Sequence, residues 1–71
     1  MSLNGSVTWS RVQILALRRH LRLTQPAFAA VVGVDSSTIS RWERGISYPQ
    51  PIYCKRLEEL SEKKAEQEAG L

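Results

Sequence analysis

The sequence contains a single cysteine, Cys54, and no apolar run that approaches the roughly 18 residues needed to cross a membrane. One cysteine excludes an intramolecular disulfide and a cysteine-rich metal site, so we expect neither metal nor cofactor. The lone histidine, His20, has no acidic neighbour in the sequence with which to form a catalytic set. With 71 residues the chain is also too short to enclose a deep pocket. These absences predict a small protein that is not an enzyme.

Acidic residues are scarce in the first 56 positions, which hold eight arginines and lysines against Asp35 and Glu43, a net charge of +6. Residues 57–71 hold five glutamates against two lysines, so this end carries −3. Seven of the eight basic residues in the first part are arginines, whose planar guanidinium group suits contacts with phosphate and guanine. The asymmetry favours a polyanionic partner for the basic part, although a solvated basic surface explains the charge equally well.

Capping residues and glycines divide the chain into four predicted helices. Thr8 or Ser10, then Thr24 and Asp35, are residue types that cap helix N-termini, and each precedes apolar residues at helical spacing. Gly33 and Gly45 follow the second and third helical stretches, where a residue with positive φ often ends a helix. The side chains expected to face the core are Ile14, Leu17, Leu21, Phe28, Ala29, Val31, Val32, Ile39, Trp42, Ile52, Tyr53, Leu57 and Leu60.

The predicted fold is therefore all-α, a compact domain of four helices, or five, over residues 9–61. Residues 1–8 are expected to form an N-terminal tail, whose first part has the composition of an expression-tag remnant. Residues 62–71 are expected to form a charged helical tail. No charged segment followed by an apolar one stands at the N-terminus, so we expect no signal peptide and a cytoplasmic location.

The second and third predicted helices are short and are joined by a tight turn at Gly33, which is the layout of a helix-turn-helix. An α-helix fits the major groove of DNA, where base edges present distinct donors and acceptors. Ser36 and Ser37 place small hydroxyls at the start of the third helix, and Arg41 can bond guanine O6 and N7 together. Gln25 begins the second helix, where free N–H groups bind phosphate. These positions predict contact with double-stranded DNA.

Three segments carry a resemblance to a known family: LTQPAFA at 23–29, GV at 33–34 and TISRWERG at 38–45. Together they resemble the phage-repressor-like (lambda-repressor-like, Cro/XRE-type) helix-turn-helix family, and the similarity extends over about residues 11–60. The resemblance implies a DNA-binding transcriptional regulator, a repressor, whose helix 36–44 enters the major groove. It also implies a bacterial or phage-encoded protein that associates with the nucleoid when bound.

The resemblance assigns roles to individual positions of this chain. The base-reading positions are Ser36, Ser37, Ser40 and Arg41. The phosphate-contacting positions are Gln25 and Arg44. Arg19 and Arg22, at the end of the first helix, either contact the DNA backbone as well or only make the protein more soluble. Arg18 and Glu43 occupy positions that imply a partly buried ion pair.

Three departures from the family pattern affect these expectations. Arg22 stands where a glycine commonly precedes the LTQ segment, and Ala27 stands where a glutamate often completes a capping box with Thr24. After Leu60 no fifth helix is evident, which leaves the mode of dimerisation open. We expect a homodimer on a palindromic site. The alternative is an antitoxin or co-activator-like module that uses the same fold to bind a toxin or another protein.

Overall fold

The computed structural model describes residues 8–69, with side chains described for residues 8–62, and within this range all regular structure is helical. The helices are α1 (Arg11–Leu21), α2 (Gln25–Val32), α3 (Ser36–Glu43) and α4 (Pro51–Ala69). The predicted all-α class is confirmed. Judged by length and hydropathy, none of the four could serve as a membrane-spanning helix. The predicted tail at 1–8 lies outside the described residues except for Thr8, and α4 continues through residues 62–69.

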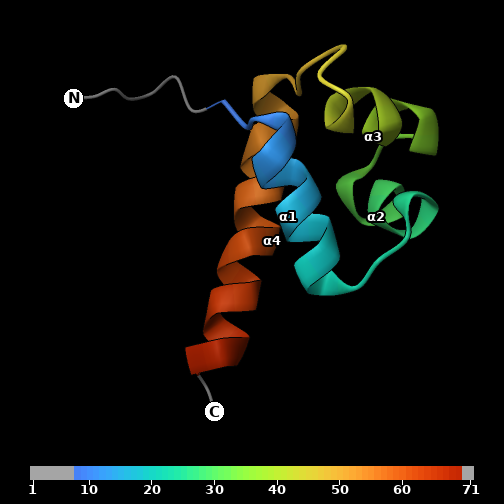
Figure 1. The fold of residues 1–71 in the computed structure, drawn as a ribbon. Coiled ribbons are helices and arrows are strands. Elements are labelled where there is room, and N and C mark those ends of the chain that lie inside the picture. Colours follow the sequence, from blue (N-terminus) through green and yellow to red (C-terminus); the bar gives the residue numbers. More distant parts are fainter. Residues whose placement is uncertain (1–7, 70–71) are drawn as a thin grey trace.

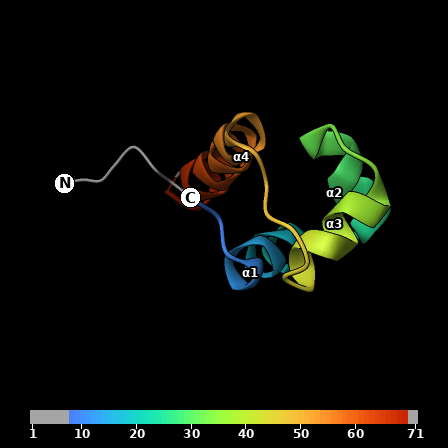
Figure 2. The same cartoon turned by 90° about the horizontal axis from the view of Figure 1, so that it is seen from above.

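The four helices form two pairs around a shared core. Figures 1 and 2 show α1 and α4 lying side by side, with α2 and α3 as a second pair next to them. The closest packing is between α2 and α3, while α1 also contacts α3 and α4 contacts both α1 and α2. This arrangement leaves one side of α3 without a covering helix (Figure 2).

Side-chain caps fix where the first two helices begin. Ser10 Oγ accepts a hydrogen bond from the Gln13 N–H at 3.2 Å, and Gln13 Oε1 accepts one from the Ser10 N–H at 2.9 Å. This reciprocal pair is a capping box, which satisfies two backbone donors at once. Thr24 Oγ1 accepts from the Ala27 N–H at 3.3 Å without a reciprocal bond, so Thr24 caps α2 alone.

The turn between α2 and α3 depends on a left-handed residue. Gly33 has φ 98° and ψ 30°, and its N–H donates to the Ala29 carbonyl at 2.8 Å. The Val34 N–H donates to the same carbonyl at 3.0 Å, so two donors close the end of α2. The predicted positive φ at Gly33 is confirmed, and this turn sets the angle between α2 and α3.

The core is built by the inward sides of all four helices. Phe28, Ile14, Ile39 and Leu57 are completely or almost completely buried. The remaining buried hydrophobic residues are Leu17, Ala29, Val32, Trp42 and Cys54. Leu21 and Leu60 are partly buried against this cluster, in keeping with their predicted inward orientation.

The predicted inward orientation is wrong for two residues. Val31 has 37% of its surface exposed and Ile52 has 69%. Val31 turns away because Phe28, Ala29 and Val32 already define the buried stripe of α2, and Val31 falls about 100° from Val32 around the helix. Ile52 turns away because the stripe of α4 passes through Cys54 and Leu57, which are buried.

Arg22, the αL residue that ends α1, provides a test of backbone strain. Its φ of 60° and ψ of 40° make it the one non-glycine residue with positive φ in the described range. An L-residue pays about 1 kcal/mol for this conformation, and glycine does not. We therefore expect Arg22→Gly to raise the free energy of unfolding by about 0.5–1 kcal/mol, measured by urea denaturation with an unchanged m-value.

The matched control is Arg19→Gly, one turn earlier on α1. Arg19 has ordinary helical geometry, so glycine should lower the free energy of unfolding there by about 1 kcal/mol. Destabilisation by both substitutions would show that Arg22 is unstrained.

Candidate nucleic-acid interface

The outward side of α3 carries the residues predicted to read bases. Ile39 and Trp42 turn inward and leave 0% and 3% of their surfaces exposed. Their burial fixes the rotation of the helix and determines which side faces solvent. The predicted readers Ser36, Ser37 and Arg41 are exposed, and Ser40 is half-buried. The predicted readers thus face solvent together, on one side of a helix about 12 Å long.

The N-terminus of α3 is held by the carboxylate of Asp35. Asp35 Oδ1 accepts hydrogen bonds from the Thr38 hydroxyl at 2.6 Å, the Thr38 N–H at 2.9 Å and the Ser37 hydroxyl at 3.0 Å. The bond from the Thr38 hydroxyl, followed by those from the Thr38 N–H and Ser37, lowers the pKa of Asp35. Ser37 therefore uses its hydroxyl hydrogen within the cap, and its oxygen remains as an acceptor.

Three helices meet at Glu43, the last residue of α3. Arg18 of α1 donates from Nε to Glu43 Oε2 at 2.6 Å and from Nη2 to Oε1 at 3.0 Å, a bidentate pair. Arg18 Nη1 also donates to the Leu23 carbonyl at 3.0 Å. From α2, Gln25 Nε2 donates to Glu43 Oε1 at 3.0 Å. We call Arg18, Gln25 and Glu43 the Glu43 network; it joins α1, α2 and α3 by side-chain hydrogen bonds.

The Glu43 network is ionic although it is largely removed from water. The side chains of Arg18 and Glu43 keep 18% and 7% of their surfaces exposed. Burial raises the pKa of Glu43, but the hydrogen bonds from Arg18 and Gln25 outweigh it, so the net shift is downward. The hydrogen bond to Glu43 likewise raises the pKa of Arg18. Both groups are charged at neutral pH, and neither can lose its partner without leaving a poorly solvated charge.

Gln25 has a contact that the sequence did not predict. Its expected role was phosphate contact at the start of α2, yet one amide hydrogen is donated to Glu43. A second amide hydrogen on Nε2 has no partner among the described residues and remains available to a ligand. The bond to Glu43 therefore fixes the orientation of the Gln25 amide, so that its second hydrogen points in a defined direction.

Residues 14–61, about two thirds of the chain, match the family model described as helix-turn-helix. The chain belongs to the helix-turn-helix family. The predicted resemblance to its phage-repressor-like branch is confirmed.

One curated relative supports the same assignment. Over 45 residues, or 63% of this chain, the sequence is 42% identical to the regulatory protein Cro of Pseudomonas phage D3. The matched stretch covers 62% of that protein, so the chain spans less than two thirds of the relative's length.

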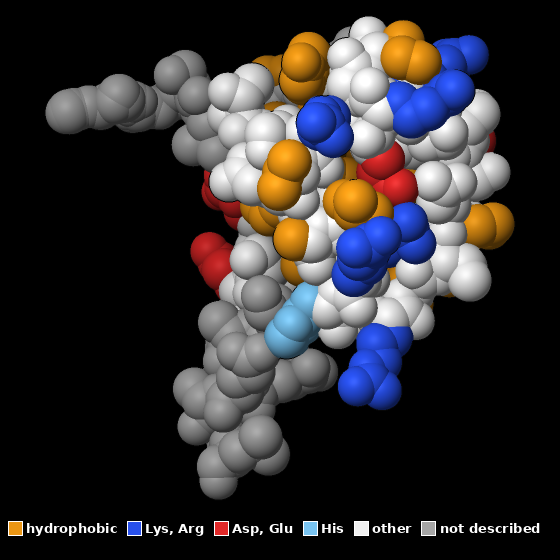
Figure 3. Space-filling model, in the orientation of Figure 1, with side chains coloured by type: hydrophobic (Ala, Val, Ile, Leu, Met, Phe, Trp, Pro, Cys, Tyr) orange, Lys and Arg blue, Asp and Glu red, His pale blue; other side chains and the backbone are white. Residues whose placement is uncertain are grey.

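Basic side chains surround the helix-turn-helix. Arg19, Arg22 and Arg44 are exposed, as predicted for backbone-contacting residues. Arg19 lies close enough to Glu43 for its charge to help lower the pKa of that carboxylate. Figure 3 shows blue basic side chains spread over the face that α1 presents, around a small red acidic patch. This side of the molecule is suited to a negatively charged surface.

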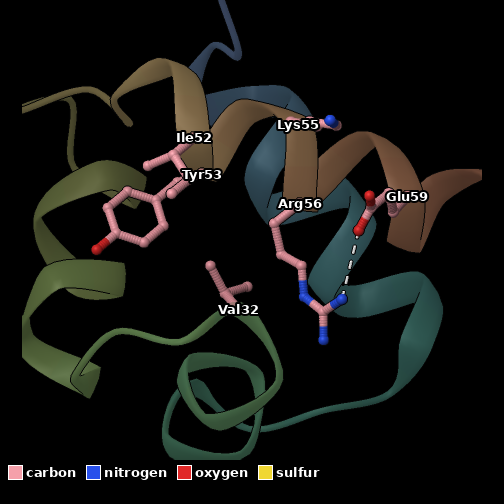
Figure 4. Close-up of a pocket in the computed structure, with 6 residues that line it drawn as sticks. All are labelled: Val32, Ile52, Tyr53, Lys55, Arg56 and Glu59. Carbon is pink, nitrogen blue, oxygen red and sulfur yellow. Dashed lines mark hydrogen bonds and ion pairs between the residues drawn. The ribbon is translucent and has the colours of Figure 1, made fainter.

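A separate groove of about 350 Å³ lies between α2 and α4. The residues that line it are Val32, Ile52, Tyr53, Lys55, Arg56 and Glu59 (Figure 4). Arg56 donates from Nε to the Val31 carbonyl at 2.9 Å and from Nη1 to Glu59 at 3.4 Å. Because sequence spacing placed Ile52 inside the core, this groove was missed by the sequence analysis.

Among the described residues, no cluster of His, Cys, Asp or Glu is suited to hold a metal ion.

Proposed function

We propose that this protein binds double-stranded DNA in a sequence-specific manner and represses transcription, with the outward side of α3 in the major groove. The observation that carries the proposal is the presentation of Ser36, Ser37 and Arg41 on one exposed side of a helix held at both ends. Asp35 caps its start and the Glu43 network anchors its end. Membership of the helix-turn-helix family supports a binding protein rather than an enzyme.

The exposed residues divide into two roles. Arg41 and the hydroxyls of Ser36, Ser37 and Ser40 read base edges, with Arg41 the most selective because a guanidinium can bond guanine O6 and N7 together. Ser37 acts as an acceptor, since its hydrogen is donated to Asp35. Contacts to the DNA backbone set the register and come from Gln25, Arg44, Arg19 and Arg22.

We also propose that two copies bind a palindromic site, with half-sites about 34 Å apart. A single domain of this size offers limited contact area, so tight specific binding requires a second copy. A regulator of this kind acts in the cytoplasm, on the nucleoid.

Arg41→Ala tests the base-reading role. The substitution removes the one long, charged donor among the proposed readers. We expect it to relax preference at one or two base pairs and to lose about 1–3 kcal/mol against the preferred site. The measurement is selection of bound sites from a random DNA pool with both proteins, followed by sizing of the complex on the selected site.

The matched control is Gln25→Ala, which removes a proposed backbone contact. It should weaken binding by a similar factor on all sequences and leave the selected motif unchanged. An unaltered motif with Arg41→Ala would remove Arg41 from the reading set. Failure of the wild-type protein to enrich any site would remove the DNA-binding function itself.

A second candidate function rests on the groove between α2 and α4. Its exposed Ile52 and partly buried Tyr53 provide apolar contact, and Arg56 has N–H groups beyond those used by Val31 and Glu59. This chemistry fits an acidic segment of a protein partner, such as the toxin of an antitoxin-like module. Retained DNA binding by Ile52→Ser would separate this groove from the DNA interface, whereas a protein partner would lose affinity for the variant.

A further inference from the structure

The side chain of Arg11, the first residue of α1, lies beside Gly45, two residues after the end of α3. A Cβ built on Gly45 would stand 3.3 Å from Arg11 Cδ and 4.0 Å from Arg11 Nε. Gly45 directly follows Arg44, the C-cap of α3, and has φ 75°. The side chain of Arg11 therefore reaches from α1 to Gly45, at the C-terminal end of α3 and 34 positions away in sequence.

The guanidinium of Arg11 has no ion-pair or hydrogen-bond partner among the described residues. The two arginines that do have such partners are Arg18, bonded to Glu43, and Arg56, bonded to Glu59 and the Val31 carbonyl. Arg11 is exposed, and its Cδ lies beside the space that a side chain on Gly45 would occupy.

We infer that Arg11 contacts the DNA backbone, sharing with Arg44 the phosphates that pass the C-terminal end of α3. The inference rests on the proposed function, because it assumes that α3 enters the major groove. A phosphate approaching this end of α3 meets the carbonyl end of the helix and the nearby carboxylate of Glu43, both of which repel it. Arg44 is the exposed C-cap of α3 and Arg11 lies beside the next residue, Gly45, so two positive side chains near this end of α3 offset that repulsion. Arg11 thereby extends the backbone contact from α3 to the start of α1.

Gly45 has a specific part in this arrangement. Its positive φ favours glycine, and a Cβ at this position would press on the stem of Arg11. The absence of a side chain at Gly45 thus leaves room for the side chain of Arg11.

The test is the salt dependence of binding to the selected site, compared for the wild-type protein, Arg11→Gln and Arg11→Lys. Each phosphate contact contributes about 0.9 to the slope of log K against log salt concentration. Arg11→Gln should reduce the slope by about 0.9 per chain, or about 1.8 for a dimer, with the selected motif unchanged. Arg11→Lys keeps the charge and should keep the slope. Lys55→Gln is the matched control, because Lys55 is exposed on α4 outside the proposed contact.

Circular dichroism and thermal unfolding of each variant show whether the fold is intact. A folded Arg11→Gln protein with the wild-type slope overturns the inference while leaving the proposed function in place. An equal loss of slope in Lys55→Gln also overturns it, because the effect would then follow net charge rather than position. Absence of DNA binding by the wild-type protein is a different result, which refutes the proposed function.

Discussion

Replacement of Arg18 by methionine is expected to lower the free energy of unfolding by about 3 kcal/mol at pH 7. Methionine keeps much of the stem volume but leaves Glu43 with a single side-chain donor, Gln25, in a site where it is only 7% exposed. The Leu23 carbonyl also loses its hydrogen bond from Arg18. This value is at the low end of the cost of breaking a buried ion pair, because 18% of the Arg18 side chain is exposed to solvent. Urea denaturation measures the change.

The control for this prediction is Arg19→Met, the neighbouring residue on α1. Arg19 is exposed, so its replacement should change the free energy of unfolding by less than about 0.5 kcal/mol. The double variant Arg18→Met with Glu43→Leu should recover much of the lost stability, because it removes the uncompensated charge. If Arg18→Met costs no more than Arg19→Met, the pair is not a structural element of the domain.

The pH dependence of the Arg18→Met effect follows from the pKa of Glu43. That pKa is lowered in the folded wild-type protein, so the stabilisation by ionised Glu43 is fully present above its ordinary pKa of about 4.5 and is lost as pH falls through the lowered value. In Arg18→Met, Glu43 is still buried but has lost the arginine, so burial favours its neutral form. Protonation of Glu43 at low pH therefore removes much of the destabilisation that the substitution causes. The difference between the two proteins should therefore shrink below about pH 4.5. A constant difference from pH 7 to pH 3 would assign the cost to packing.

The helix boundaries could be predicted because the signals for them are local. Thr24 and Asp35 cap the helices that follow them, and Gly33 adopts the positive φ that its position suggested. The capping box of Ser10 and Gln13 is equally local, but it was not predicted: the sequence offered Ser10 as a capping residue, and the reciprocal bond from Gln13 was missed. Short-range backbone chemistry therefore determines where the elements of this fold begin and end.

The parts that could not be predicted depend on how the helices turn against one another. Ile52 was grouped with the inward residues Tyr53, Leu57 and Leu60 from its spacing in the sequence, but packing of the helices selects the side of α4 that carries Leu57. The bond from Gln25 to Glu43 joins residues 18 positions apart, and the approach of Arg11 to Gly45 joins residues 34 apart. No periodicity within one helix reports such a contact. The positions on α3 are an intermediate case, because burial of Ile39 and Trp42 determines its outward side.

Binding to the selected DNA site is expected to weaken by about 10⁴-fold when the salt concentration rises from 50 to 200 mM. The proposed backbone contacts include four exposed arginines in each chain: Arg11, Arg19, Arg22 and Arg44. Eight such contacts in a dimer release enough counterions for a slope of about −7 in log K against log salt concentration. Titrations of a labelled site at several salt concentrations, at constant pH, give this slope directly.

The measured slope also separates the models of the bound state. One chain with four phosphate contacts predicts a slope of about −3.6, and a loss of only about 150-fold over the same range. Sizing of the complex distinguishes this monomer from a dimer that gives the same slope. In that dimer only Arg11 and Arg44 of each chain reach the DNA, while Arg19 of α1 and its C-cap Arg22 point to solvent. In that case Arg19→Gln leaves the slope unchanged while Arg44→Gln lowers it. A slope near zero would contradict the backbone contacts altogether, because no arrangement of unpaired arginines on a polyanion can avoid counterion release.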